Sequence, residues 1–458
     1  MTVTADGYQL LEQTVEIADG SALTLTLEAN PRFRAAGDPF VRAAGTHFVI
    51  GARSFKFIGV NLRGLAHYGT PQMPYARAHD QLDAARQMGA RVVRIFLPHR
   101  DLSPDEAEAR LAGLLDLLKR EYPEMYLIIA LTNLYGDVGF DVPGDLSFYD
   151  LQPGNSGPHI LNLHWFNEGY KQNYLPFVRR IVSRFRNKPA IMAWNIGNEL
   201  KAEADPDLLI RFKHAMAREI RRLDPNHLIT TGMISTRHAH MGSDPAKRRQ
   251  LYSSADIDFI TNHAYHIDGN DKPSPEDDSD LLRDIPKPLL IEEAGFESRE
   301  DRTGLYQAEM DRLFARGASG YMPWGFMAGD GNTGDGDDAL GLDRKWHAAD
   351  WESLNRLFRA RADQLAAEAI EIPLATGDFA AGQVVFAAQG ARLRRPAGLD
   401  GGIVYTMLAR TRVTVQGPSE RRDDLRWWPV RVPLDDGRTE DGWIAQTTPS
   451  GAVLLSAV

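Results

Sequence analysis

The feature that most constrains the fold is a regular alternation of short apolar runs with longer amphipathic segments. The apolar runs are residues 57–61, 91–96, 125–132, 190–196, 227–232, 258–265, 288–293 and 319–325. Segments with helical periodicity separate them, among them 79–90, 104–122, 174–187, 206–223 and 303–317. Strands that alternate with helices form parallel βαβ units, and eight such strands close a barrel. The pattern therefore predicts an α/β protein built on a (β/α)8 TIM barrel. A doubly wound open sheet is the alternative, but it would show fewer strands and an early glycine-rich phosphate turn.

The regions on either side of this alternation predict further units. Residues 1–39 contain an apolar–polar alternation around Ala18, Asp19 and Gly20, which predicts an N-terminal β-hairpin extension. A last helix at 351–369 should complete a catalytic barrel over residues 40–370. After Pro373 short β-runs alternate with Gly, Pro and Asp turns, so we expect residues 374–458 to form a small all-β module.

Composition narrows the possible functions. Asp and Glu number 62 against 52 Lys and Arg, and the formal net charge of −10 disfavours nucleic acid as a partner. Cysteine is absent, which excludes thiol nucleophiles, disulfides and zinc–thiolate sites. No run approaches the roughly 18 apolar residues of a membrane helix, so no membrane partner is expected. No signal peptide is visible; we nevertheless expect an extracellular protein with a trimmed or non-standard export signal, although a cytoplasmic location stays open.

Polar residues gather where the predicted strands end. In a barrel of parallel strands these ends form the mouth in which active sites lie. Hydrolysis of an acetal needs a carboxylic acid that protonates the leaving oxygen and a carboxylate that attacks the oxocarbenium-like carbon. The set contains two such carboxylates, a cation, amides and aromatic rings: Asn61, Arg94, Asn133, Asn198, Glu199, His263, Tyr265, Glu293 and Trp324. It predicts glycoside hydrolysis without a metal or another cofactor.

Two motifs carry a family resemblance. AWNIGNEL (193–200) resembles the acid/base motif of clan A glycoside hydrolases, and IEEAG (291–295) resembles their nucleophile motif. The segments FVRAAGTHFVIGARSFKFIGVN (40–61) and 164–199 resemble family 5 β-mannanases more closely. The resemblance extends over about residues 40–366. It implies a retaining endo-β-glycoside hydrolase that cleaves a neutral polysaccharide of the β-1,4-mannan or glucomannan type.

The resemblance also implies roles for the two carboxylates. Glu199 would be the general acid/base and Glu293 the nucleophile. Because side chains alternate between the faces of a strand, only one of Glu292 and Glu293 should face the barrel mouth. The family pattern of a Glu two positions before Gly selects Glu293 and leaves Glu292 turned toward the helices; the swapped assignment is the alternative.

The remaining roles follow from the same resemblance. Arg94 would hold the nucleophile ionised, Asn198 would bind the 2-hydroxyl of the sugar, and Tyr265 would donate to the nucleophile. His263 would line the site near the acid/base, and Trp324 would stack on the sugar. Asn61 is expected to support the substrate site. The alternatives are a structural salt bridge for Arg94, a satisfied core position for His263 and barrel packing for Trp324.

Alternative activities remain open. An exo-β-mannosidase or β-glucosidase would need a blocked cleft, and the long loop from Leu134 to Tyr170, which carries Trp165, is a candidate for the block. A β-1,4-glucanase and a non-catalytic carbohydrate-binding barrel are further alternatives. Residues 329–343 contain G-x-G-x-x-G, but a dinucleotide site is excluded because the match follows the last predicted strand. We expect a solvated or substrate-lining loop there, with bound calcium as the alternative.

The C-terminal segment LRWWPVRVPLDDGRTEDGWIAQ (425–446) resembles bacterial SH3-type domains. The resemblance implies possible contact with cell-wall or polysaccharide ligands. Trp427, Trp428 and Trp443 are then either a sugar platform or, as we expect, core and docking residues.

Overall fold

The computed structural model describes most of the chain after residue 39. The described residues are 2–3, 11–12, 40–51, 53–97, 102–134, 148–151, 159–202, 204–224, 226–235, 245–254, 256–266, 279, 285, 287–297, 301–327, 340–344, 347–370, 379–387, 391–407, 411–423, 425–434, 438–446 and 454–457. The predicted turn at residues 18–20 and most of the glycine-rich loop at 329–343 lie outside them, as does the central part of the loop after Leu134.

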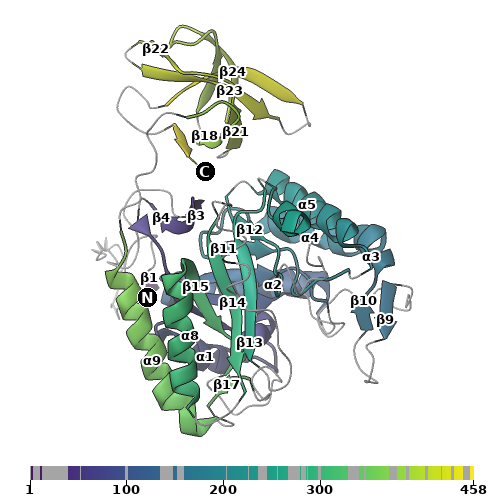
Figure 1. Cartoon of the computed structure of the whole chain (residues 1–458), viewed down its shortest axis with the longest axis vertical. Coiled ribbons are helices and arrows are strands. Elements are labelled where there is room, and N and C mark those ends of the chain that lie inside the picture. Colours follow the sequence, from purple (N-terminus) through teal and green to yellow (C-terminus); the bar gives the residue numbers. More distant parts are fainter. Residues whose placement is uncertain are drawn as a thin grey trace, which may run out of the picture.

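Eight parallel strands form the centre of the molecule (Figure 1). They are β6 (Phe57–Asn61), β7 (Val92–Phe96), β8 (Tyr126–Ala130), β11 (Ile191–Asn195), β12 (Leu228–Thr230), β13 (Ile260–His266), β14 (Leu289–Phe296) and β15 (Ala318–Pro323). Their order in the sheet is β12-β11-β8-β7-β6-β15-β14-β13. A parallel bridge between Thr230 and Phe259 joins the two edge strands. This curled sheet is consistent with a (β/α)8 fold.

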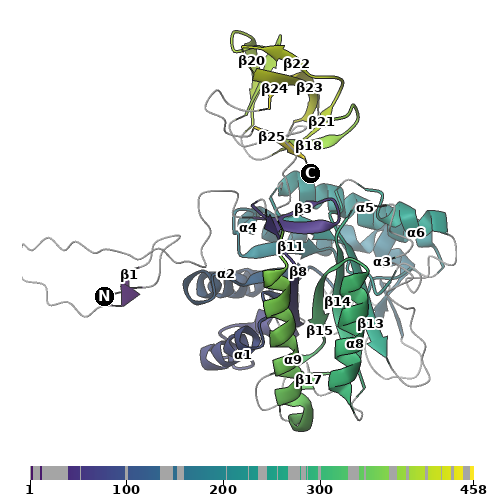
Figure 2. The ribbon, with the colours of Figure 1, turned by 60° about the vertical axis from the view of Figure 1, so that its left-hand side comes forward.

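Helices cover the outside of the sheet (Figure 2). They are α1 (Tyr75–Gln87), α2 (Pro104–Glu121), α4 (Tyr174–Phe185), α5 (Pro206–Leu223), α6 (Pro245–Leu251), α8 (Arg302–Ala315) and α9 (Ala348–Ala367). Helix α2 begins at a capping box in which Ser103 and Glu106 satisfy each other's backbone N–H groups. The side chain of Asp205 accepts from Leu208 N at the start of α5, and each of these helices has proline at its first position.

The alternation of side chains along the strands divides the core into two parts. In β8, Tyr126 and Ile128 point into the barrel, while Leu127 and Ile129 pack against the helices. The hairpin of β3 (Val41–Ala44) and β4 (His47–Ile50) adds Phe48 to the inner core. Because this hairpin precedes β6, it covers the end of the barrel where the strands begin. The opposite end is left for the loops that follow the strands.

Shorter elements complete the loops that surround the barrel. They are η1 (Arg63–His67), α3 (Leu163–Asn167), η3 (Gly169–Lys171), and the strand pairs β9 (Tyr149–Leu151) with β10 (His159–Leu161) and β16 (Phe326–Met327) with β17 (Leu342–Asp343). At the N-terminus β1 (Thr2–Val3) pairs with β2 (Leu11–Glu12). No helix in the described part of the chain is long and apolar enough to cross a membrane.

A second sheet, antiparallel, follows the barrel. It comprises β18 (Val384–Ala387), β19 (Arg392–Arg395), β20 (Gly402–Thr406), β21 (Thr411–Val415), β23 (Leu425–Pro433), β24 (Thr439–Ala445) and β25 (Leu455–Ala457), and β22 (Glu420–Arg422) pairs with β23. We call it the C-terminal sheet. The side chains of Trp427 and Trp428 are buried in its cores, and Trp443 is partly buried. The sugar-platform hypothesis therefore fails for Trp427 and Trp428.

The C-terminal sheet contacts the end of the barrel where the strands begin (Figure 1). Arg412 of β21 forms an ion pair with Asp258, which lies just before β13 and also pairs with Arg221 of α5. The guanidinium of Arg412 lies 5.3 Å from the ring centre of Phe386. This sheet is thus attached at the end opposite the loops that follow the strands.

Candidate active site

The first carboxylate, Glu199, stands on a turn that follows β11. Its backbone is left-handed, with φ 54°, and its N–H donates to Gly232 O at 2.8 Å. Asn195, the last residue of β11, accepts from Gly197 N at 2.9 Å through its side chain. A non-glycine residue is strained in this conformation, and such strain is maintained only where the surroundings determine it.

Gly232 and Lys213 hold this turn in place. Gly232 has φ +67°, and a Cβ added there would lie 2.2 Å from Asn195 Oδ1. Only glycine therefore permits the close approach of residue 232 to the turn. The buried ammonium of Lys213 donates to the carbonyls of Gly197 and Thr231, which ties the turn to the segment after β12. Burial lowers the pKa of Lys213 well below its usual value.

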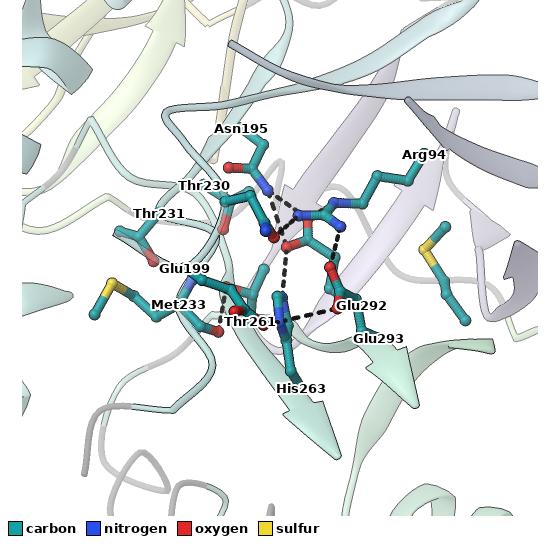
Figure 3. A network of polar contacts seen from close by, with 12 residues as sticks. Arg94, Asn195, Glu199, Thr230, Thr231, Met233, Thr261, His263, Glu292 and Glu293 are labelled. Atoms are coloured by element: carbon teal, nitrogen blue, oxygen red, sulfur yellow. Dashed lines mark hydrogen bonds and ion pairs between the residues drawn. The ribbon is translucent and has the colours of Figure 1, made fainter. Parts of the chain in front are cut away.

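The second carboxylate lies on β14, where the structure corrects our expectation for its neighbour. Glu292 does not face the helices: its carboxylate is fully buried inside the barrel, in contact with Asn195 and His263. The register against β13 shifts here, since Asn262 pairs with Ile291 and His263 pairs with Glu293. A bulge of this kind places two consecutive residues on the same face. Both Glu292 and Glu293 therefore point inward, as Figure 3 shows.

Glu199 and Glu293 meet across the mouth of the barrel with His263 between them (Figure 3). One carboxylate oxygen of each glutamate and one ring nitrogen of His263 all lie within 4.8 Å of one another. His263 Nδ1 is 2.8 Å from Glu199 Oε1 and 3.3 Å from Glu293 Oε2. Carboxyl groups about 5 Å apart suit a displacement in which one of them attacks carbon directly, whereas a wider gap would admit a water between them.

Two donors hold Glu293 in place. Arg94 Nη1 donates to Glu293 Oε1 at 2.5 Å, and the Tyr265 hydroxyl donates to Glu293 Oε2 at 2.6 Å. Hydrogen bonds from a guanidinium and a hydroxyl fix the direction of a carboxylate. This geometry is what a nucleophilic carboxylate requires.

Arg94 also positions two asparagines. Its Nη2 donates to Asn198 Oδ1 at 2.7 Å, and its Nη1 donates to Asn61 Oδ1 at 3.1 Å. Asn198 in turn donates to Asn133 Oδ1 at 2.9 Å, so the four strand-end residues lie in one network. The amide of Asn61 donates to the carbonyl of Glu292 at 2.9 Å, which makes Asn61 a buried support below the site.

The charges in this network shift the pKa values of its members. Burial alone would lower the pKa of His263, but Glu293, Glu199 and Glu292 outweigh it and raise that pKa to about 9. Burial would raise the pKa of Glu292, but the Arg94 guanidinium and His263 keep it below its ordinary value. The same carboxylates raise the pKa of Arg94 against the effect of its burial.

Trp324 lies at the end of β15 and is only partly buried. Its ring centre is 6.3 Å from that of Phe96, and it packs against Phe96 and Ala130. One part of the indole therefore packs against the barrel, and another part is exposed.

Two residues of the network, Asn195 and Lys213, were not among the candidates from the sequence, and Glu292 entered only as the alternative to Glu293. Asn195 lies in the same AWNIGNE motif as Glu199, and Glu292 lies beside Glu293, so proximity in the motif was an available signal. Lys213 lies in the middle of α5 and has no such signal.

The trio Glu199, His263 and Glu293 has a spacing that suits a cation. An ion there would have to displace the existing hydrogen bond between Glu199 and His263 and compete with Arg94 for Glu293.

Comparison with known proteins agrees with this geometry. Residues 165–269 match a family model described as GH family 5 beta-mannosidase-like. A probable mannan endo-1,4-beta-mannosidase C of Aspergillus terreus is 28% identical over 202 residues, which are 39% of this chain and 48% of the relative. A mannan endo-1,4-beta-mannosidase A of Podospora anserina is 29% identical over 228 residues, 45% of this chain and 57% of the relative. The chain thus spans about half the length of these curated relatives.

Solved structures show the same fold. An endo-1,4-beta-D-mannanase from Thermotoga petrophila superposes with a TM-score of 0.53 at 24% identity, over 68% of this chain and 100% of that one. A family 5 mannosidase from Rhizomucor miehei superposes with a TM-score of 0.56 at 16% identity, over 72% of this chain and 99% of that one. At these identities the similarity shows the fold alone.

Proposed function

We propose that this protein is a retaining endo-β-glycoside hydrolase that cleaves β-1,4-mannan or glucomannan by double displacement. The observation that carries the proposal is the placement of Glu199 and Glu293, whose carboxyl oxygens lie within 4.8 Å of each other at the mouth of a parallel barrel. Glu293 attacks the anomeric carbon while Glu199 protonates the leaving oxygen. Glu199 then takes a proton from the water that hydrolyses the glycosyl-enzyme ester.

The contacts of Glu293 support its role as nucleophile. Arg94 and Tyr265 donate to its two oxygens, which fixes the direction of the carboxylate. Asn198, held by Arg94, supplies the amide that binds the 2-hydroxyl of the sugar, a contact that strengthens in the transition state. Trp324 provides the aromatic surface for the apolar face of the sugar.

The choice of mannan as substrate is supported by the names of the relatives, since both curated relatives described above are mannan endo-1,4-beta-mannosidases. The test is to incubate the purified protein with mannan, glucomannan and cellulosic glucans and to follow new reducing ends. The anomer formed first is read by proton NMR. We expect release from mannan with β-configured product; α-configured product would refute the retaining mechanism, and no release from any polymer would refute the activity.

An exo-acting β-mannosidase is a second candidate, because the matched family model is described as beta-mannosidase-like. The loop from Leu134 to Tyr170, which carries Trp165, is the candidate for blocking the cleft. The side chain of Trp165, which belongs to α3, is buried against Tyr174 of α4 and Phe212 of α5. Trp165 therefore does not itself block the cleft. Fast hydrolysis of an aryl β-mannoside together with little action on polymer would favour the exo reading.

We further propose that residues 374–458 form a separate SH3-type module, with residues 1–39 as an N-terminal extension of the barrel at 40–370. The C-terminal sheet contacts the barrel at the end away from Glu199 and Glu293, so a polysaccharide or cell-wall ligand bound by it would tether the enzyme and not line its cleft. Because polymeric mannan does not cross a membrane, an extracellular location suits this function. Pull-down of residues 374–458 on insoluble mannan and on cell walls tests the module.

A further inference from the structure

Glu292 is a third carboxylate beneath the catalytic pair. Its side chain is fully buried, and both of its oxygens accept from Asn195 Nδ2 at 2.9 Å. His263 Nε2 lies 3.4 Å from Glu292 Oε2, and Arg94 Nε lies 3.4 Å from Glu292 Oε1. Figure 3 shows Glu292 on one side of the His263 ring, with Glu199 and Glu293 near the other nitrogen. The double displacement as described above gives Glu292 no role.

We propose that Glu292 is a positioning residue that keeps a proton on His263 Nε2, so that Nδ1 is the ring nitrogen that shares a proton with Glu199. The proposal rests on the proposed function, because it concerns which atom holds the proton that Glu199 donates as the acid/base. In this arrangement Glu292, His263 and Glu199 form a chain of carboxylate, imidazole and carboxyl group. The proton of the Glu199–His263 pair is then either on Glu199 or on Nδ1, and it is available to the leaving oxygen only through Glu199.

The chemistry of the groups supports this assignment. An ionised carboxylate only accepts hydrogen bonds, so the ring nitrogen that faces Glu292 carries the hydrogen. The nitrogen that faces Glu199 is 2.8 Å away, within the range of a strong hydrogen bond. Asn195 Nδ2 and Arg94 Nε fill other positions around Glu292, so its carboxylate is surrounded by donors.

The charges around His263 and Glu292 are consistent with a hydrogen-bonded series of Glu292, His263 and Glu199. The titratable groups around this pair are Arg94 on β7, Lys213 on α5, Tyr265 on β13, Glu293 on β14 and Glu199 after β11. Glu292 is one of the carboxylates that raise the pKa of His263 to about 9 against its burial. Because Arg94 and His263 lower the pKa of Glu292, its carboxylate stays ionised through neutral pH. We therefore expect loss of the Glu292 charge to lower the pKa of the groups that share protons in this network.

The direct test is NMR of the histidine ring nitrogens in the full-length protein, with His263 assigned through a His263→Gln variant. The wild-type ring should stay protonated at Nε2 across neutral pH and titrate near pH 9. In Glu292→Gln the midpoint should fall by about one unit or more, because a neighbouring anion is lost. Glu292→Asp keeps the charge and should recover part of the shift. An unchanged midpoint in Glu292→Gln overturns the proposal. This measurement needs no turnover, so it is distinct from a failure of the proposed function.

The kinetic test is the pH profile of kcat/KM on the substrate that the wild type cleaves. Glu292→Gln should move both limbs of the profile to lower pH by about one unit, because loss of the anion weakens proton binding by the remaining groups. We expect KM to stay within about twofold of the wild-type value. Asp224→Asn is the matched control. Asp224 is a buried carboxylate beside His227 and Trp194, and it precedes β12 at the other end of the barrel. We expect it to lower thermal stability and leave both limbs in place. If Glu292→Gln behaves in the same way, Glu292 is only structural and the proposal is wrong.

Discussion

Arg94 Nη1 lies 2.5 Å from Glu293 Oε1, and the side chains of both residues are almost fully shielded from solvent. The guanidinium reaches Asn198 and Asn61 at the same time, so a single residue of β7 aligns the nucleophile with two amides. A lysine has a single ammonium on a flexible stem. It lacks the planar guanidinium that donates to Glu293, Asn198 and Asn61 in three fixed directions. Arg94 therefore carries geometry as well as charge.

Arg94→Lys should lower kcat by about 100-fold, because the point charge cannot hold Glu293 and Asn198 together. Arg91→Lys is the control: Arg91 lies just before β7 and donates to Glu124 O at 3.0 Å, at the other end of the strand. We expect it to keep kcat within about twofold of the wild type. Steady-state kinetics on mannan and circular dichroism of both variants check this. Full activity in Arg94→Lys would contradict the role that we assign to the fork.

The two carboxylates should respond differently to an added small nucleophile. In Glu199→Ala an activated aryl glycoside still forms the glycosyl-enzyme, and azide should restore turnover with a β-glycosyl azide as product. In Glu293→Ala azide enters the space left by the nucleophile, so the rescued product should be the α-azide. Proton NMR of the products distinguishes them. A β-azide from Glu293→Ala would reverse the assignment of the two residues.

Gly232 should be intolerant of a side chain for a reason beyond its backbone conformation. Its φ is +67°, and a Cβ would meet Asn195 Oδ1 at 2.2 Å, which would displace the turn that carries Glu199. Gly45, with φ +57° and no atom within 4 Å of its Cβ position, is the matched control. Gly45→Ala should lose about 1 kcal/mol of stability with unchanged kcat. Gly232→Ala should lose more and also lower kcat, as urea unfolding and kinetics will measure. Equal losses in the two variants would rule out the clash.

The pH dependence of stability should contain a contribution from His263. Its pKa is raised from 6.5 to about 9, so the folded state binds its proton more tightly than the unfolded state does. The resulting stabilisation is fully present below about pH 6.5 and is lost as the pH rises through about 9. The difference in Tm between the wild type and His263→Gln should therefore be larger at pH 6 than at pH 10. A difference that grows with pH would have the wrong sign for this mechanism.

The attachment of the C-terminal sheet should depend on Arg412. Burial, together with the neighbouring Arg221, lowers the pKa of Arg412 to about 10, and its ion pair with Asp258 crosses from β21 to the barrel. Arg412→Ala should cost about 2 kcal/mol in scanning calorimetry and leave kcat unchanged, because the pair lies far from the strand ends. Arg431→Ala breaks the exposed pair with Asp441 and should cost under about 1 kcal/mol. Equal costs would indicate that Arg412 does not hold the interface.

Much of the barrel was predictable because helix and strand formation depends on patterns among neighbouring residues. The helix expected at 206–223 and the strand expected at 57–61 have the predicted bounds. The strand-end residues could be proposed for the same reason, since parallel strands in a closed barrel end at one mouth. Arg94, Asn198, His263, Tyr265 and Glu293 lie together as that argument implies.

The direction of Glu292 was decided only by the tertiary structure. Alternation along an isolated strand places Glu292 and Glu293 on opposite faces, and that reasoning turned Glu292 toward the helices. The shift of register between β13 and β14 depends on how two distant segments pair, and no local pattern encodes it. The same holds for Lys213 and for the attachment of the C-terminal sheet through Asp258. The sequence alone determined which residues form the strands and which side chains follow them, because these depend on neighbours along the chain. The folded structure alone decided which charges meet, because burial and long-range pairing determine where a carboxylate can remain ionised.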